Sequence, residues 1–397
     1  MVFRSTVVAA IVIYLLAASP PIWADNVNPK AANPQEHAAM MELTAAQRYL
    51  HGSFKPIAVE KLQKLANERP DWEFNAQVEL DLAHSQMNNR DYEKCLNSCE
   101  RLKSKYRDSK PDIAVSAQYY KAACLSRMTK YPEAVAACNE MATYTGNLGD
   151  GDLSAILQAQ RKLAELIWLK KLDSSKLFNF APGDVNGQVW MHSVMMAKHA
   201  MRGDLEDAYQ EYQEIKGMLP AGDKRLALAG LRLLSSELDA YERSATKYPS
   251  ALTHANQLMQ ELESAYPSQA WLLTRGKLVL AASMIRQRVE LAEAQKLCQD
   301  VVNQGAIPNL MPQAYSLLAE TYYAQEDFTK AAQLAGVVAE KYPYSTWADF
   351  ATFMCADSLY KAGSKAAAAA KLDQLMKEYP DSGWVEAAKV MKEVTWK

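Results

Sequence analysis

The residues best suited to chemistry gather in one short stretch, residues 190–201 (WMHSVMMAKHAM). His192, Met196 and His199 are spaced four and three residues apart, so they share one face of a helix. Imidazole and thioether ligands in this arrangement suit copper. Met195 and Met196 also occupy inward packing positions together with the two histidines, and methionine fills irregular gaps well. The stretch therefore predicts either a packing face or a metal site, and packing is the simpler interpretation.

Catalytic motifs are missing from the sequence. The six histidines form no His-Glu-x-x-His pair, and no Gly-x-Ser-x-Gly elbow or phosphate-binding glycine loop occurs. Carboxylates are numerous, but they fall on the polar faces of predicted helices, where a solvated surface explains them. We therefore predict a protein that is not an enzyme and that needs no cofactor.

The cysteines leave two interpretations open. Cys95 and Cys99 are one turn apart on one predicted helix, which is poor geometry for a bond between them, but either could meet Cys124 on the next helix. An oxidising compartment would permit that disulfide. Buried free cysteine also behaves as a small apolar residue, and the spacing does not fit a zinc site. The six cysteines are Cys95, Cys99, Cys124, Cys138, Cys298 and Cys355.

Residues with these roles are held in place by helices, and the clearest pair of predicted helices covers residues 312–343. Apolar residues at helical spacing predict a first helix, Gln325 to Asp327 supply a polar turn, and small residues follow on a second helix that Pro343 ends. Neither helix buries its apolar face alone, so the unit needs neighbours on both sides. The residues that define it are Tyr315, Leu318, Ala319, Tyr322, Phe328, Ala331, Ala335, Val338 and Pro343.

This pattern resembles the tetratricopeptide repeat (TPR), a helix pair of about 34 residues. The resemblance implies an all-α fold, a right-handed α-α superhelix or TPR-like solenoid of about nine helix pairs. Several helices end in Tyr-Pro, at Tyr248, Tyr266, Tyr342 and Tyr379. These endings resemble exported bacterial TPR proteins, such as the TPR subunit of the outer-membrane barrel-assembly machinery and the Tol-Pal-associated division coordinator.

Length and charge agree with a solenoid. A single compact core is not expected for 397 residues, whereas each repeat of a solenoid contacts only its neighbours. Glycine is sparse, at 15 residues, which favours helices. The formal net charge is −2, so the chain offers no strongly basic surface, and we expect no nucleic-acid partner.

The N-terminus predicts export. Arg4 precedes an apolar run at residues 7–18, two prolines and a small residue, Ala24, before Asp25. This pattern is typical of a cleaved signal peptide over residues 1–24, and the run is shorter than the roughly 20 residues of a spanning helix. We expect a periplasmic protein without stable membrane insertion. A secreted protein, or one anchored by an uncleaved N-terminus, is the alternative.

The rest of the chain divides into segments that match the repeat pattern to different degrees. A polar leader covers residues 25–36, and N-terminal TPR-like repeats follow over residues 37–146. Residues 147–188 predict a degenerate helix pair with a long loop. The last two segments are central TPR-like repeats over residues 189–306, and C-terminal TPR repeats with a capping helix over residues 307–397.

The resemblance also implies a binding groove, because the first helices of such repeats present solvent-facing residues to a ligand. Phe350 and Phe353 have an alternative role, packing against the last helix. We predict a non-catalytic scaffold that binds a protein or peptide in cell-envelope assembly or maintenance. The alternative is a periplasmic protein that binds a small molecule or copper through the Met/His stretch and the loop at residues 178–187. The predicted partner-binding residues are His84, Tyr119, Arg127, Glu320, Tyr323, Phe350, Phe353, Asp357, Tyr360 and Lys361.

Overall fold

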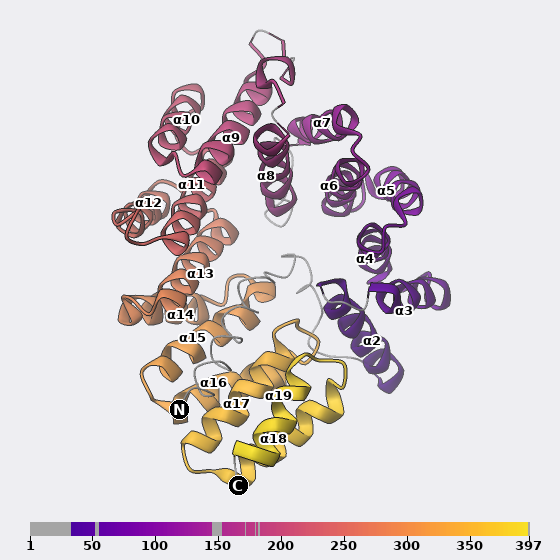
Figure 1. The fold of residues 1–397 in the computed structure, drawn as a ribbon, viewed down its shortest axis with the longest axis vertical. Helices are drawn as coiled ribbons and strands as arrows, with labels where there is room; N and C mark the ends of the chain where they lie inside the picture. The colour runs from indigo at the N-terminus through magenta and orange to yellow at the C-terminus, as the bar shows by residue number, and fades with distance from the viewer. Residues whose placement is uncertain are drawn as a thin grey trace. The chain divides into compact units, whose positions relative to one another are not determined.

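The computed structural model of the chain is helical throughout its described part (Figure 1). Within the described ranges every regular element is a helix, and no strand occurs. This confirms the predicted all-α, TPR-like superhelical fold. The predicted signal peptide lies outside the described residues, and the first described helix, α2 (Pro34–His51), begins at Pro34. The structure describes residues 33–51, 55–144, 153–170, 172–178, 180–181 and 183–395.

The chain forms two compact units. The central unit comprises residues 62–280, and the terminal unit comprises residues 1–61 together with 281–397. The boundaries fall within α3 (Lys55–Glu68) and α13 (Ala270–Gln287). The other helices of the central unit are α4 (Asn75–Asn88), α5 (Tyr92–Tyr106), α6 (Pro111–Arg127), α7 (Tyr131–Glu140), α8 (Leu153–Leu169), α9 (Val185–Arg202), α10 (Leu205–Met218), α11 (Lys224–Arg243) and α12 (Ala251–Ala265). The terminal unit contains α2, α14 (Leu291–Gln304), α15 (Met311–Ala324), α16 (Phe328–Lys341), α17 (Ala348–Lys361), α18 (Lys365–Glu378) and α19 (Trp384–Val390).

The pair α15–α16 shows why these segments fold as helix pairs. Pro312 lies in the first turn of α15, where its missing N–H costs nothing. The Asp327 side chain caps α16 by accepting a 3.1 Å hydrogen bond from the Lys330 backbone N–H. Ala331 and Ala335 are completely buried, so the two helices approach closely. The predicted two-helix unit is therefore confirmed, with its turn at residues 325–327.

One turn recurs between the two helices of six pairs. A residue with a left-handed backbone lies one or two positions after each first helix. The next N–H bonds the carbonyl oxygen five residues before it, which satisfies the helix end. Only two of the six left-handed residues are glycine. The six are Arg90, Thr129, Gly203, Arg288, Glu326 and Gly363, and the hydrogen bonds join 91 to 86, 130 to 125, 204 to 199, 289 to 284, 327 to 322 and 364 to 359.

In its described residues, the segment predicted as a degenerate pair contains α8, then the short 3₁₀ turn η3 (Ser174–Lys176), and it ends in the first turn of α9. Asp184 then caps α9 by accepting a 3.0 Å hydrogen bond from the Gly187 N–H. A Cβ at Gly187 would lie 2.2 Å from Phe180 Cγ, so only glycine allows this ring to cover the start of α9.

Within the terminal unit, α2 packs on the C-terminal repeats (Figure 1). Thr44 donates a 3.0 Å hydrogen bond to the Tyr344 carbonyl oxygen. The Arg48 guanidinium lies 3.3 Å from Asp349 and 4.7 Å above the Tyr379 ring. Residues about 300 positions apart in the chain thus form one packed unit, which the sequence did not predict.

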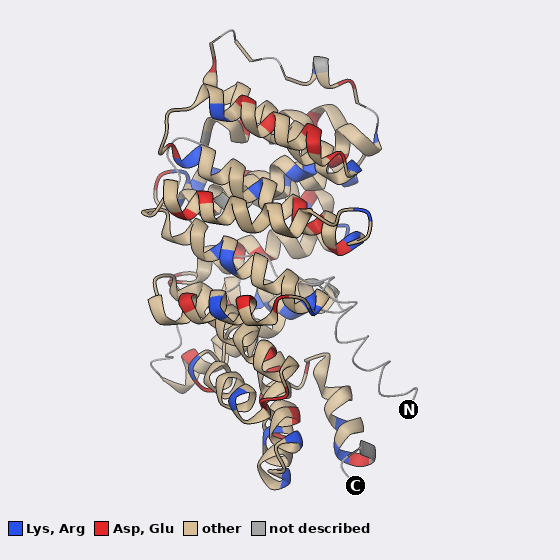
Figure 2. Ribbon diagram, turned by 90° about the vertical axis from the view of Figure 1, so that its left-hand side faces the viewer, with Lys and Arg blue, Asp and Glu red and all other residues tan. Residues whose placement is uncertain are grey.

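Charge is mixed over the described part of the chain. Figure 2 shows acidic and basic residues interspersed along the helices rather than separated into blocks of one sign. Among the described helices, none combines the length and the apolar character that crossing a membrane requires.

Candidate functional site

Three of the predicted partner-binding residues meet in the terminal unit. Tyr323, at the end of α15, donates a short hydrogen bond to the Asp357 carboxylate on α17. Lys361, one turn further along α17, hydrogen-bonds the Tyr323 hydroxyl and lies 3.5 Å from Asp357. Its ammonium also lies 4.3 Å above the Tyr323 ring and 5.2 Å above the Phe328 ring. We call Tyr323, Asp357 and Lys361 the first-helix cluster.

The electrostatics of this cluster keep its hydrogen bonds in place. Burial raises the pKa of Tyr323, and the neighbouring Asp357 raises it further, so the phenol stays protonated as a donor. The Lys361 side chain is 39 % exposed, whereas that of Asp357 is only 16 % exposed. The cluster therefore presents an ammonium group on an aromatic base to the solvent, while its carboxylate is largely covered.

Phe350 and Phe353 are not solvent-facing, so their prediction as exposed groove residues was wrong. They are only 8 % and 4 % exposed. Both pack on Trp384 of α19, with ring centroids 5.3 Å and 4.9 Å away, and the Phe353 ring is stacked at 27°. The alternative role, packing against the last helix, is confirmed for both.

Glu320 also departs from the predicted open position. Its Oε1 atom is buried and has no hydrogen-bond partner among the described residues. Burial raises the pKa of Glu320 to about 7, and only the Arg286 guanidinium opposes this shift. Cys298 of α14 lies close enough for the Glu320 charge to add to the burial that raises the pKa of its thiol. Glu320 is thus an inward-facing acid and offers little surface to a partner.

Tyr360, the last predicted residue of the terminal unit, is half-buried. The ammonium of Lys365, the first residue of α18, lies 5.6 Å from the centre of its ring. Tyr360 therefore adds an aromatic ring near the end of α17, one residue before Lys361 of the first-helix cluster.

In the central unit the predicted residues surround a buried tyrosine. The His84 ring of α4 stacks on Tyr120 of α6 at 4.6 Å, and the Tyr119 ring lies 5.4 Å from the same ring. Burial raises the pKa of Tyr119 to about 12. Arg127, at the end of α6, is exposed and donates a 3.3 Å hydrogen bond to the Met87 carbonyl oxygen. These contacts connect α4 and α6, the first helices of two successive pairs. Of the three predicted residues here, Arg127 is the one that is exposed.

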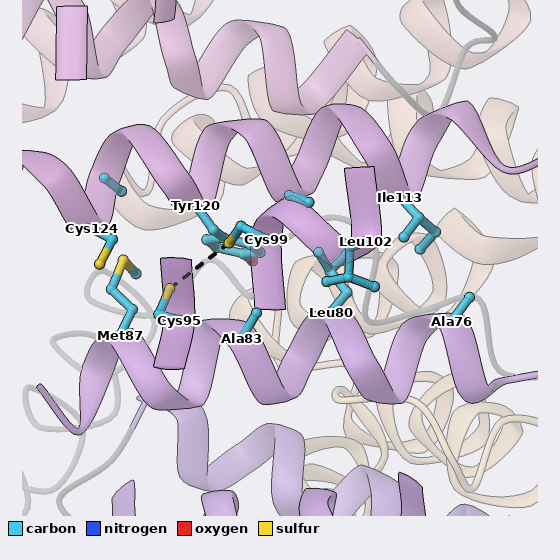
Figure 3. Close-up of a cluster of buried hydrophobic side chains, with 12 residues drawn as sticks. Ala76, Leu80, Ala83, Met87, Cys95, Cys99, Leu102, Ile113, Tyr120 and Cys124 are labelled. Atoms are coloured by element: carbon cyan, nitrogen blue, oxygen red, sulfur yellow. Dashed lines mark hydrogen bonds between the residues drawn. The ribbon is translucent and has the colours of Figure 1, made fainter. Parts of the chain in front are cut away.

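All six cysteines are free and buried. Figure 3 shows Cys95, Cys99 and Cys124 in the apolar cluster formed by α4, α5 and α6. The Cys95 and Cys99 sulfur atoms are 3.9 Å apart, and Cys124 donates to the Tyr92 carbonyl oxygen. Burial raises the pKa of the Cys138 thiol to about 12, which leaves it little thiolate character. The interpretation as small apolar core residues is the one that this structure shows.

The Met/His stretch forms part of α9, and its side chains separate. Met196 is fully buried in the core. His192 instead places its Nδ1 2.6 Å from Glu211 of α10, and His199 places its Nε2 3.7 Å from the same carboxylate. The histidines thus face carboxylates, which argues against the soft sulfur-rich site that copper(I) prefers.

A different set of possible ligands lies at the start of α10. Ligand atoms of His199, Asp204 and Asp207 all lie within 4.8 Å of one another. Asp204 also pairs with Arg202 at 3.1 Å, and the Asp207 side chain is 63 % exposed. A neighbouring guanidinium and open solvent both weaken such a site for a metal ion.

A cavity that the sequence did not predict lies beside these residues in the central unit. It has a volume of about 910 Å³ and is lined by α10, α11, α12 and the turns that precede α10 and α12. Its residues come from three separate segments, 203–209, 233–237 and 247–261. Each carboxylate resembles part of a solvated helix face when the sequence is read alone. The signal that could have found it is the acidic content shared by these segments.

Residues 351–382 match the family model described as "Tetratricopeptide repeat". The matched segment holds most of α17 and all of α18, and includes Asp357 and Lys361 of the first-helix cluster. A search of the curated proteins finds no match to the chain. The repeat and the all-helical fold are typical of scaffolds for protein interaction. The narrower resemblance to exported envelope proteins stays a prediction.

Proposed function

We propose that the chain is an exported, non-catalytic scaffold that binds a protein or peptide through the exposed first-helix residues of its repeats. The observation that carries this proposal is the first-helix cluster, where consecutive first helices contribute Tyr323, Asp357 and Lys361. Aromatic rings and a cationic group in one place are typical of the energetic centre of an interface. The cluster lies in and beside the segment that matches the TPR.

The chemistry of the cluster indicates the kind of partner. Lys361 supplies the exposed charge, and the rings beneath it supply apolar area. A partner segment with a carboxylate and a neighbouring apolar residue would complement both. Asp357 already accepts from Tyr323, so it holds the lysine in position instead of contacting the partner.

A partner-capture experiment tests this assignment. The purified chain, used as bait in an envelope extract, is expected to recover a partner that Lys361→Glu recovers about tenfold less. Lys296→Glu is the matched control, because Lys296 is an exposed lysine on a second helix, α14, where it pairs with Glu293. Equal recovery by the wild type and Lys361→Glu would place the binding surface elsewhere. Failure of the wild type to recover any partner would count against the scaffold itself.

The export proposal needs its own measurement. It rests on the basic, apolar and small-residue pattern of residues 1–24. Expression of the whole chain, followed by N-terminal sequencing of the protein from the periplasm, is expected to give a chain that starts at Asp25. A full-length chain retained in the cytoplasm would refute export.

A further inference from the structure

The cavity of the central unit has the walls and the size of a ligand-binding site. Leu233 and Glu237 are one turn apart on α11 and line one side of it. The second helices α10 and α12 form its walls, and residues 247–250 close one end. Its volume of about 910 Å³ lies within the range of ordinary ligand sites.

The rim of the cavity is held by close contacts. Gly203 has φ +87, and a Cβ there would lie 1.9 Å from the Tyr248 hydroxyl oxygen. Only glycine therefore lets the turn before α10 meet the loop before α12. Arg243, at the end of α11, donates hydrogen bonds of 3.0 Å to the carbonyl oxygens of Ala200 and Met201. These contacts fix α11 against the end of α9, so the cavity is preorganised.

The lining of the cavity is strongly acidic. It carries five carboxylates and a single lysine, Lys247, whose ammonium lies 5.1 Å from the Tyr248 ring centre. A concave surface lined by one sign of charge raises the local concentration of the opposite ion. The five acidic residues are Asp204, Glu206, Asp207, Glu237 and Glu261.

Glu237 is the residue that points to a ligand. Its side chain is only 6 % exposed, yet its Oε2 atom has no hydrogen-bond partner among the described residues. The His254 ring nitrogen lies 3.8 Å away, beyond hydrogen-bond distance. A buried carboxylate without a donor is costly. A donor that enters the cavity from outside would remove this cost.

The rings of Tyr209 and Tyr248 complete the lining. Tyr209 is 50 % exposed, which is unusual for a large aromatic side chain, and an aromatic face attracts organic cations. We propose that this cavity binds a flexible organic cation, with one ammonium or guanidinium group on Glu237 and a second near the rim carboxylates. A free polyamine and a basic segment of a protein share this chemistry.

Proton release should accompany binding. Burial raises the pKa of Glu237 to about 7, so near neutral pH this carboxyl is partly protonated. A cation beside it favours the charged form, so affinity should rise between pH 6 and pH 8. The imidazole of His254 also faces the site. The carboxylates of Asp207 and Glu261 and the amine of Lys247 also face the cavity, so the variant Glu237→Gln is needed to isolate the Glu237 contribution.

Calorimetric titration of the full chain tests the proposal. The two probes are spermidine and a peptide of alternating glycine and lysine. Tighter binding of spermidine would indicate a free polyamine as the ligand, and tighter binding of the peptide would indicate a basic protein segment. Glu237→Gln is expected to weaken the bound probe about tenfold at pH 8 and less at pH 6. Tyr209→Ala, which alters a half-exposed side chain and spares the fold, should weaken it about fivefold.

A matched control variant is Glu214→Gln, because Glu214 is an exposed acid on the same helix, α10, and does not line the cavity. It should bind either probe within about twofold of the wild type. The proposal is overturned if neither probe binds, or if Glu237→Gln binds as the wild type does. It is also overturned if magnesium chloride at equal ionic strength displaces the probe equally from the wild type and Glu237→Gln. The proposed first-helix cluster is unaffected by these outcomes, because it lies in the other unit.

Discussion

Two glutamates that each have a buried carboxylate oxygen, one in each unit, make an instructive comparison. Burial raises the pKa of both Glu320 and Glu237 to about 7, and each has one carboxylate oxygen without a hydrogen-bond partner among the described residues. Glu320 lies within range of the Arg286 guanidinium, whereas Glu237 lines a cavity of about 910 Å³. The same chemical group thus has a cation of the protein nearby in the terminal unit, whereas in the central unit it faces a cavity.

The wider surroundings of the two acids differ in the same way. In the terminal unit, Trp384 covers Phe350 and Phe353, and Arg48 of α2 reaches Asp349 and Tyr379. Surfaces that a TPR leaves open are therefore covered by elements at the ends of the chain. In the central unit, α10, α11 and α12 instead line a cavity.

Removal of the Trp384 ring, which covers Phe350 and Phe353, should have the largest effect on stability. Trp384→Ala takes away the ring that packs on both phenylalanines, and we expect it to lower the free energy of unfolding by about 3 to 5 kcal/mol. Chemical denaturation followed by circular dichroism measures this loss. The exposed Phe350 and Phe353 should also bind a hydrophobic dye.

Val390→Ala is the control for Trp384→Ala, because Val390 lies on the same helix and is 54 % exposed. Its effect should stay within about 0.5 kcal/mol. If Trp384→Ala were equally mild, the two phenylalanines would be available to a partner, and the contrast between the units would fail.

Loss of the contact between α2 and the C-terminal repeats should come next. The Arg48 and Asp349 side chains are 12 % and 9 % exposed, so their ion pair is largely withdrawn from solvent. Arg48→Ala leaves a buried carboxylate and removes the cation above Tyr379, and we expect a loss of about 3 kcal/mol. A double-mutant cycle with Asp349→Asn should give a coupling of about 1 kcal/mol or more. A coupling near zero would show that this ion pair does not help to hold α2.

The sequence predicted local structure well and long-range contacts poorly. Periodicity and proline positions were enough to place α15 and α16, because both depend on residues a few positions apart. The exposure of Phe353 depends on Trp384, which is 31 residues away, and no local pattern reports that contact. The same holds for the packing of α2 on Tyr344 and for the cavity, whose lining comes from three segments.

The recurring turn shows another limit of the sequence. Left-handed residues are expected to be glycine, and Gly203 and Gly363 fit this rule. Arg90, Thr129 and Glu326 adopt the same conformation, because the packing of each helix pair and the hydrogen bond across the turn impose it. The geometry of the repeat therefore outweighs local preference at these positions.

The pH dependence of stability should separate the two glutamates. An acid whose pKa is raised by folding destabilises the folded state as pH rises from the unfolded value, near 4.5, to the folded value, near 7. Each acid thus costs up to about 3 kcal/mol at pH 8, and little at pH 4. Glu320→Gln and Glu237→Gln should each reduce this loss in denaturation curves measured from pH 4 to pH 8.

The two variants differ in their response to a cation. Spermidine should raise the stability of the wild type and Glu320→Gln at pH 8, and it should have little effect on Glu237→Gln. An equal response of all three proteins would remove the distinction between the acid beside Arg286 and the acid that is open to a ligand.

The smallest effect is expected at the first-helix cluster. Lys361→Met keeps the apolar stem above Tyr323 and removes only the ammonium, which is partly exposed. The loss of an exposed cation–π contact and of a weak ion pair should cost less than about 1 kcal/mol, because Asp357 retains the hydrogen bond from Tyr323. Thermal unfolding measures this cost, and the partner-capture experiment measures binding in parallel. A large loss of binding with a small loss of stability is what an interaction surface requires, since its exposed charge is not needed by the fold. If Lys361→Met instead lost more than about 2 kcal/mol, Lys361 would be a structural clamp between α15 and α17, and the terminal unit would have no open site among the residues proposed for it.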